Sequence, residues 1–276
     1  MPLDLLAIDR TDDEIEVALG EAGTIVRAYR EQDSGCVSYV VEQPGRRLFV
    51  KAAMTSHGTA SLARAAALHE AVRHRALPRL LNTFDSPQGP AHVYAWVPGE
   101  VLYDYVTMDG EQGRCDPASP HTRFRALPVR RILDALDVVY DLHVAIAAAG
   151  LVAVDFYDGC ILYDFARHRT WVCDLDEYRP GPFTLDEDRL PGSKRFMAPE
   201  EFEKGSTIDQ RTNIFTLGRT AAVLLGDGDV DSPAWRGGAA LRQIVKQAVS
   251  PDRTQRYESV SEYVSAWTRA RPEALV

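Results

Sequence analysis

Short runs that mix hydrophobic and polar residues dominate the first hundred positions of the chain. Two of them, 36–41 (CVSYVV) and 47–50 (RLFV), lie on either side of Gln43-Pro44-Gly45. β-Branched and aromatic residues favour strands, whereas Pro and Gly favour turns. This part of the sequence therefore predicts two strands joined by a tight turn.

The same region contains further strand-like runs near 80–84 and 92–97, after which Pro98-Gly99 breaks the pattern. The segment 59–76 is different, because it is rich in alanine and contains neither Gly nor Pro. Such a composition favours a helix. We therefore expect residues 1–97 to form strands together with one helix.

Beyond this point the spacing of apolar residues becomes mainly helical. Between 132 and 147 they recur every three or four positions, and Gly150 follows the segment. This pattern predicts an amphipathic helix that ends before the glycine. A second such helix is expected at about 211–225, and the C-terminal region is also expected to be helical.

Three segments between these helices have another character. Residues 161–174 (ILYDFARHRTWVCD) predict a hairpin of two strands. A long polar loop is expected from 174 to about 199. Residues 104–128, which include MDGEQGRCDPASP, are also expected to form a loop.

Composition and charge narrow the class of protein. A chain of 276 residues is longer than a typical single domain, so two packed lobes are expected. Its 45% hydrophobic and 26% charged content is typical of a folded globular protein. The net charge of −9 argues against nucleic acid as a partner, because phosphates repel an acidic surface.

No segment has the pattern of a secretion signal or a membrane span. The N-terminal stretch MPLDLLAIDRTDDEIEV acquires acidic residues early, and the longest apolar stretch, 132–154, contains three aspartates. The four cysteines show no C-x-x-C spacing, so neither a zinc site nor a disulfide framework is expected. We therefore expect a cytoplasmic protein that does not bind membranes.

Two aspartates each come at the end of an apolar segment, and the predicted hairpin would bring the two segments together. Asp155 follows the long helix and Gly150, and Asp174 comes nineteen residues later at the end of the run TWVCD. Buried carboxylates beside hydrophobic strands are costly unless a cation or a substrate satisfies them. Metal-bound phosphate is one ligand that would do so.

Three further features stand in a fixed order with these aspartates. Lys51 ends the strand-like run RLFVK, and Glu70 lies nineteen residues later in the predicted helix. Ala198-Pro199-Glu200 follows the polar loop, and Arg256 near the C-terminus is a candidate ion-pair partner for Glu200. The order of these features along the chain resembles that of a protein kinase: a strand lysine, a helix glutamate, a loop aspartate, a strand-end aspartate and A-P-E.

This resemblance to the protein-kinase-like superfamily extends from about 35 to 267. It is closest to bacterial kinases of the eukaryotic Ser/Thr type, with degenerate glycine-rich and catalytic loops. It implies an α+β, two-lobed fold. A small N-lobe, 1–97, would contain an antiparallel sheet and one helix, and a larger, mainly helical C-lobe would span 98–276. The resemblance further implies ATP and Mg²⁺, or Mn²⁺ in its place, as cofactors.

The family's roles can be carried over residue by residue. Lys51, held by Glu70, would contact the α- and β-phosphates of ATP. Asp174 would bind Mg²⁺, and Asp155 would act as the base that deprotonates the acceptor hydroxyl. The segment 94–97 resembles the hinge, where backbone groups near Ala95 and Val97 would bind adenine.

The glycine-rich loop keeps only part of the family's pattern. Gly35, with Val37 two residues later, resembles the end of that motif and would contact the nucleotide. The earlier glycine positions carry other residues, so the loop would lie further from the phosphates. An ordinary hairpin glycine is the alternative interpretation of Gly35.

The catalytic loop also departs from the family. Cys160 stands where the family has the asparagine that binds a second metal, and a neutral thiol is a poor ligand for Mg²⁺. Asp176 or Asp158 would then supply the missing oxygen, although Asp176 is also a candidate turn cap. Tyr157 replaces the lysine that Ser/Thr kinases commonly have. Asn213 replaces an anchoring aspartate, but its amide can still accept from backbone N–H groups.

Three functions remain open from the sequence. The leading hypothesis is an ATP- and Mg²⁺-dependent kinase that phosphorylates Ser or Thr of a protein substrate. A pseudokinase, acting as a nucleotide-binding or scaffolding module, is favoured by Cys160, Tyr157 and the glycine-poor loop. A small-molecule kinase is suggested by Asp174-Leu175-Asp176 in place of D-F-G.

Overall fold

The computed structural model describes residues 3–31, 33–104, 108 and 110–275. The chain has an α+β fold and divides into two compact units, Met1–Pro98 and Gly99–Val276. Within the described residues there are eight α-helices and one five-stranded antiparallel sheet. No helix in these residues is both long and apolar enough to cross a membrane.

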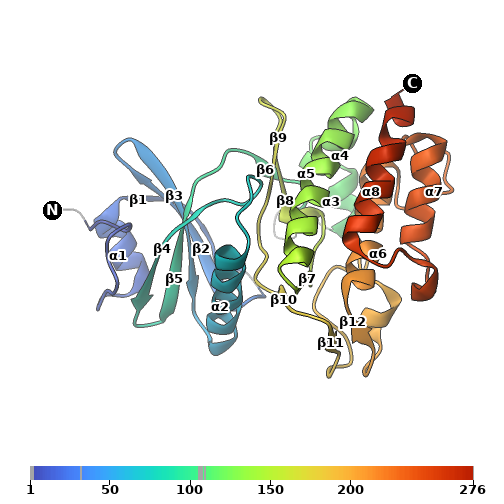
Figure 1. Ribbon diagram of the computed structural model, residues 1–276. Coiled ribbons are helices and arrows are strands. Elements are labelled where there is room, and N and C mark those ends of the chain that lie inside the picture. The colour runs from blue at the N-terminus through green and yellow to red at the C-terminus, as the bar shows by residue number, and fades with distance from the viewer. Residues whose placement is uncertain (1–2, 32, 105–107, 109, 276) are drawn as a thin grey trace. The chain divides into compact units, whose positions relative to one another are not determined.

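The first unit is built around the five-stranded sheet, whose strand order is β1-β2-β3-β5-β4 (Figure 1). Its elements are α1 (Ile15–Ala22), β1 (Thr24–Tyr29), β2 (Cys36–Gln43), β3 (Arg46–Ala53), α2 (Ser56–Ala71), β4 (Leu80–Ser86) and β5 (Gly89–Ala95). The β2–β3 hairpin turns at Pro44-Gly45, where Gly45 has φ +78°. This confirms the hairpin predicted from the sequence.

The two helices of this unit pack on opposite faces of the sheet. Ile15 and Leu19 of α1 join a core cluster with Leu48, Val50 and Ala52 of β3. Leu62 of α2 contacts the other face, in a cluster with Cys36 and Ala53. Because side chains alternate along a strand, Phe49 and Lys51 lie on the face that α2 covers.

The prediction of a single helix in this unit was wrong. Helix α1 is short, but its buried residues Ile15, Ala18, Leu19 and Ala22 follow the i, i+3, i+4, i+7 spacing of an amphipathic helix. The end of α2 also differs from the prediction. The helix stops at Ala71, and Val72 has extended backbone angles.

The second unit is mainly helical. Its α-helices are α3 (Gly110–Cys115), α4 (Pro120–Arg125), α5 (Val129–Ala148), α6 (Gln210–Leu225), α7 (Gly238–Ala248) and α8 (Val260–Ala270). Helix α5 contributes a row of buried residues from Ile132 to Ile146, and Gly150 follows it with φ +73°. The two long helices predicted from the sequence are confirmed by α5 and α6.

Short strands and 3₁₀ turns connect these helices. The strands are β6 (Glu100–Val101), β7 (Leu151–Val152), β8 (Ile161–Asp164), β9 (Arg169–Val172), β10 (Arg179–Pro180), β11 (Phe183–Thr184) and β12 (Thr207–Ile208). The 3₁₀ turns are η1 (Asp158–Cys160), η2 (Pro199–Phe202), η3 (Arg253–Gln255) and η4 (Arg271–Leu275). The β8–β9 hairpin confirms the prediction for 161–174.

The segment 104–128 differs from the loop that the sequence predicted. It contains α3 and α4, and the Ser119 hydroxyl caps α4 by accepting from the amide of Thr122. Residues 105–107 and 109 lie outside the described part. The two short helices are too brief to show a hydrophobic period, so turn-forming residues dominated the sequence pattern.

Candidate functional site

Lys51 is buried on the sheet face that α2 covers. Only 5% of the residue is exposed, and it stands opposite Ser38 on β2 and His92 on β5. Burial lowers the pKa of His92 to about 4, and the positive charges of His69 and Lys51 add to this shift. His92 is therefore neutral near pH 7, and Lys51 carries the positive charge of this pair.

The structure does not form the ion pair predicted between Lys51 and Glu70. Glu70 lies in the last turn of α2 and is exposed, and its carboxylate forms no ion pair or hydrogen bond within the described residues. The preceding residue, His69, faces the sheet instead, with its ring centroid 5.5 Å from that of Tyr94. The glutamate misses the sheet because one residue along a helix rotates the side chain by about 100°.

Val37 lies on the wrong face of the sheet to contact a ligand beside Lys51. It is paired with Ala52 and packs on the core cluster that includes α1. A shift of one residue moves a side chain to the other face of a strand. Ser38, and not Val37, lies directly opposite Lys51, and it is fully buried.

Gly35 has a packing role in the structure. Its φ is +70°, its carbonyl accepts from the amide of Met54 at 2.9 Å, and a Cβ at this position would overlap the hydroxyl of Thr55. Thr55 caps α2 by accepting from the amide of Gly58. Gly35 is therefore needed where β2 begins beside the N-terminus of α2.

The proposed hinge residues lie at and after the end of β5. The amide of Ala95 already donates to the carbonyl of Arg79 at 2.9 Å. Val97 lies beyond the strand, in a segment without regular secondary structure. Phe49 and Tyr94 are paired across β3 and β5, with ring centroids 6.4 Å apart, on the same face as Lys51. Aromatic rings therefore line this face between Lys51 and the end of β5.

In the second unit, the backbone around Asp155 is held in place by α6. The side chain of Asn213 accepts from the amide of Ala153 at 3.0 Å and donates to the carbonyl of Ala153 at 2.8 Å. This confirms the prediction that the amide of Asn213 accepts from a backbone N–H group. Asp155 itself has φ +60°, a left-handed conformation that costs a non-glycine residue about 1–3 kcal/mol.

Cys160 lies between Asp155 and Asp174. This residue is fully buried. Its Sγ atom lies 3.4 Å from the carbonyl oxygen of Asp155 and 3.9 Å from that of Asp174. Burial raises the pKa of Cys160, and the charges of Asp174 and Asp155 raise it further. The thiol is therefore neutral, and its contacts are with backbone oxygens.

Asp174 shares the left-handed conformation of Asp155, with φ +60°. Both aspartates also act on Tyr157, whose pKa is raised first by burial and then by the electrostatic effects of its neighbours Cys160, Asp174 and Asp155. The structure therefore brings Asp155 and Asp174 to one place, although nineteen residues separate them. Tyr157 keeps its proton there and can donate a hydrogen bond.

The structure argues against the metal role predicted for Asp158. This carboxylate is fully buried and accepts from the Arg114 guanidinium, with Nε–Oδ2 and Nη2–Oδ1 distances of 3.0 and 3.1 Å. His121 Nδ1 lies 3.1 Å from Oδ2. These contacts lower the pKa of Asp158 against the opposing effect of burial. Asp158 thus anchors the segment of α3 and α4 to the turn after Asp155.

Asp176 is the remaining candidate for a second oxygen ligand. It is buried, with 7% exposure, in the turn two residues after Asp174. Within the described part of the chain no three His, Cys, Asp or Glu side chains are grouped as a metal site. Mg²⁺ bound through substrate phosphates needs only one or two protein carboxylates. The oxygens of Asp174 and Asp176 have the donor chemistry that this ion prefers.

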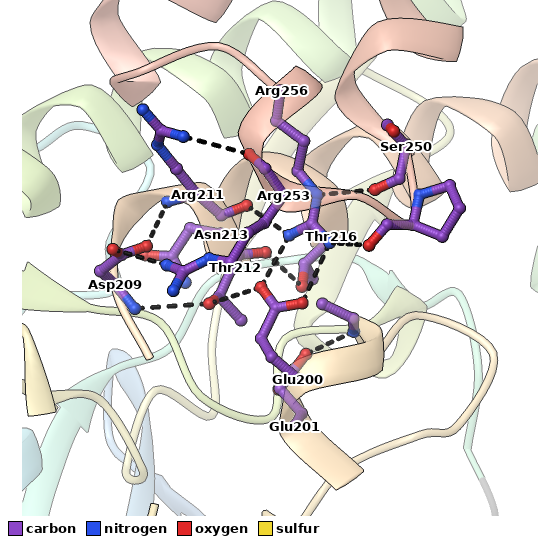
Figure 2. A network of polar contacts seen from close by, with 12 residues as sticks. Glu200, Glu201, Asp209, Arg211, Thr212, Asn213, Thr216, Ser250, Arg253 and Arg256 are labelled. Atoms are coloured by element: carbon purple, nitrogen blue, oxygen red, sulfur yellow. Dashed lines mark hydrogen bonds and ion pairs between the residues drawn. The ribbon is translucent and has the colours of Figure 1, made fainter. Parts of the chain in front are cut away.

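A buried ion pair fixes the segment after the long loop, as predicted. Arg256 donates to both carboxylate oxygens of Glu200, at 2.7 and 3.0 Å, and the Thr212 hydroxyl donates to the same carboxylate at 2.9 Å (Figure 2). The guanidinium also donates to the carbonyls of Arg211, Ser250 and Pro251. This network joins η2, α6 and the C-terminal region.

The next residue, Glu201, is also buried but has no cationic partner at its carboxylate in the described residues. Burial raises its pKa to about 8, and the charges of Glu200 and Asp155 add to the shift, whereas the Ala198 amide, which donates to it at 2.6 Å, lowers it. Near neutral pH this carboxyl group is therefore largely protonated.

Comparison with known proteins adds no family assignment. The sequence matches no known protein-family model, and no curated protein is significantly similar to it.

Replacing Arg256 by alanine is expected to destabilise the protein by about 3–5 kcal/mol, because Glu200 would keep a buried charge without a partner. Urea titration would measure this change. Arg253→Ala serves as a matched control, since its pair with Asp209 is partly exposed and is expected to contribute less than about 1 kcal/mol. Equal effects of the two substitutions would contradict this interpretation.

Glu201→Gln is expected to remove a pH dependence of stability. The folded-state pKa of Glu201 lies above its unfolded value of 4.5, so the wild type loses stability as pH rises toward about 8. The stability gained by the variant should therefore increase by roughly 1 kcal/mol per pH unit between about pH 5 and pH 8. Unfolding titrations across this range would measure it. Glu203→Gln, at an exposed position, should show no such trend.

Proposed function

We propose that this protein transfers a phosphoryl group from ATP, with Mg²⁺, to a hydroxyl acceptor. Serine or threonine of a protein is our leading candidate for that acceptor. The proposal includes a two-lobed, protein-kinase-like arrangement of the two units. The main observation in its support is that Asp155 and Asp174 lie close together. The thiol of Cys160 contacts the backbone carbonyls of both, and the charges of both act on it.

The backbone conformation of the two aspartates supports a functional role. Both residues have φ +60°, a strained conformation that persists only where the surrounding structure fixes it. Such residues are concentrated at active sites and ligand clamps. Mg²⁺ prefers carboxylate oxygens as ligands and carries phosphate with it. A metal–nucleotide ligand is therefore a function that both strained aspartates would serve.

Each residue has a defined part in the proposed reaction. Asp174, with Asp176, would hold Mg²⁺, which would neutralise charge on the phosphates. Asp155 would accept the proton of the acceptor hydroxyl. Lys51, a buried cation, would bind the phosphates. Phosphoryl transfer depends mainly on positioning and on electrostatic stabilisation, and these groups supply both.

The loop between Asp174 and Pro199 supports a protein acceptor. A Cβ on Gly192 would lie 3.4 Å from Oδ1 of Asp155, so this part of the loop runs beside the proposed base. The same point lies 3.3 Å from Sδ of Met197, so a glycine with φ +142° is what lets the loop backbone lie this close to Asp155. The loop ends at η2, which the Glu200–Arg256 pair holds rigidly. An extended peptide would have a fixed surface beside Asp155.

Two observations favour a pseudokinase as the second candidate. The carboxylate of Glu70 is exposed and forms no ion pair in the described residues, so it does not hold Lys51. The neutral thiol of Cys160 faces backbone carbonyls and offers no oxygen to a second metal. A nucleotide-binding module with little turnover would tolerate both features.

Aspartate-dependent transfer tests the proposed reaction. Asp155→Asn is expected to lower the rate of radiolabelled phosphate transfer to a protein substrate at least about 100-fold, because a general base is lost. Asp174→Asn is expected to reduce the rise in melting temperature caused by ATP and Mg²⁺. Asp186→Asn, at an exposed position in the same loop, is the matched control. Stabilisation by ATP with no aspartate-dependent transfer would select the pseudokinase.

Nucleotide binding should depend on Lys51 and not on Glu70. Lys51→Met is expected to weaken ATP binding about tenfold, because one charge-assisted contact to the phosphates is lost. Glu70→Gln should leave affinity unchanged, since its carboxylate forms no ion pair in the described residues. Isothermal titration with Mg²⁺ and ATP measures both effects. A comparable loss of affinity in both variants would contradict the roles assigned here.

A further inference from the structure

A buried histidine of α5 contacts two segments that lie beside the proposed acids. His143 is 2% exposed. Its Nε2 atom lies 2.9 Å from the hydroxyl oxygen of Tyr178, and its ring centroid lies 4.6 Å from that of Phe156. Phe156 directly follows Asp155, and Tyr178 comes shortly after Asp174. One side chain therefore joins the two segments on which the proposed chemistry depends.

The hydrogen bonds of His143 determine which ring nitrogen carries its proton. Nδ1 lies 2.7 Å from the carbonyl oxygen of Val139, one turn earlier in α5. A carbonyl oxygen can only accept, so Nδ1 carries the hydrogen and donates it. In the neutral ring Nε2 is then an acceptor, and the hydroxyl of Tyr178 donates to it. Burial raises the pKa of Tyr178, and the nearby Cys160 and Asp155 raise it further, so this hydroxyl keeps its proton.

Tyr178 holds the turn that contains Asp176. It is 1% exposed, and its amide donates to the carbonyl of Leu175 at 3.4 Å. This hydrogen bond closes a turn directly after Asp174. Strand β10 begins at the next residue and pairs with β7, the strand that leads to Asp155. A fixed Tyr178 side chain therefore limits where Asp174 and Asp176 can lie.

Phe156 is the second contact of the histidine ring. It is 3% exposed and packs against His143. Its neighbour Asp155 has φ +60°, a conformation that persists only where the surroundings fix it. The packing of Phe156 on the imidazole supplies part of this constraint. The same ring therefore restrains the backbone at Asp155 and the turn at Tyr178.

We propose that His143 and Tyr178 are positioning residues, which hold the proposed base Asp155 at the right distance from the carboxylates of Asp174 and Asp176. Both side chains are buried, so they act through the acids and not on the substrate. An error of about 1 Å in the position of a reacting group can slow a reaction about 100-fold. The inference rests on the proposed function, and it adds the residues that keep the two acidic segments in register.

Tyr178→Phe tests this role, because it removes the hydroxyl that donates to His143 and keeps the ring. We expect kcat for transfer of radiolabelled phosphate from ATP to dephosphorylated casein, or to water, to fall about tenfold. Tyr263→Phe is the matched control, since it removes another buried hydroxyl of the same unit, which donates to that of Tyr140 at 3.0 Å. Urea titration should show a similar loss of stability in both variants, but only Tyr178→Phe should lose activity.

Substitutions of the histidine separate positioning from general packing. His143→Gln keeps an oxygen that can accept from the Tyr178 hydroxyl, so it should retain most of the wild-type kcat. His143→Leu has no such acceptor and should lower kcat about tenfold. Combining His143→Leu with Tyr178→Phe should lower kcat no further than His143→Leu alone, because both changes remove the same hydrogen bond.

The outcomes distinguish this inference from the proposed function. Wild-type kcat in Tyr178→Phe, an equal loss of kcat in Tyr263→Phe, an equal loss in His143→Gln and His143→Leu, or multiplied losses in the double variant would each overturn the inference and leave the proposed function standing. Absence of transfer to either acceptor by the wild type would overturn both.

Discussion

A single buried thiol lies against the backbone of both aspartates on which the proposed chemistry depends. Cys160 stands directly before β8, and Cys173 directly follows β9, with the Cys173 amide donating to the Cys160 carbonyl at 2.9 Å. The hairpin therefore closes next to the thiol, which contacts the carbonyls of Asp155 and Asp174. The thiol is fully buried, and burial keeps it neutral. This side chain therefore links the backbone segments of the two acids.

Other contacts in the second unit hold the segments on either side of this thiol. Asn213 fixes the backbone at Ala153, and Arg256 fixes Glu200 at the end of the long loop. Arg114 and His121 fix the turn at Asp158. Buried polar groups of this kind stabilise one conformation when all their partners are present. The strained backbones at the two aspartates are thus maintained by surroundings that do not take part in the proposed chemistry.

The sequence was most informative where local pattern decides structure. The β2–β3 and β8–β9 hairpins and the long helices followed from apolar spacing and turn residues. Helix α1 was missed, although Ile15 and Leu19 carry a helical spacing, because the segment is only eight residues long.

Errors of one residue in register changed the predicted site more than this missed helix did. Ser38 lies on the face of Lys51, whereas the prediction named its neighbour Val37. In the same way His69 faces the sheet, whereas the prediction named its neighbour Glu70. The burial of Asp158 depends on Arg114, forty-four residues away, and no local pattern predicts it.

The proposed chemistry requires Asp155 and Asp174 to act together on a metal–nucleotide ligand. Electron paramagnetic resonance of Mn²⁺ is a sensitive test, because the bound and free ions have different spectra. We expect the protein to bind Mn²⁺ when ATP is present, and Asp174→Asn to abolish this signal while the fold is retained. Retention of the bound signal in Asp174→Asn, or its absence in the wild type with ATP, would rule out this role of the two aspartates.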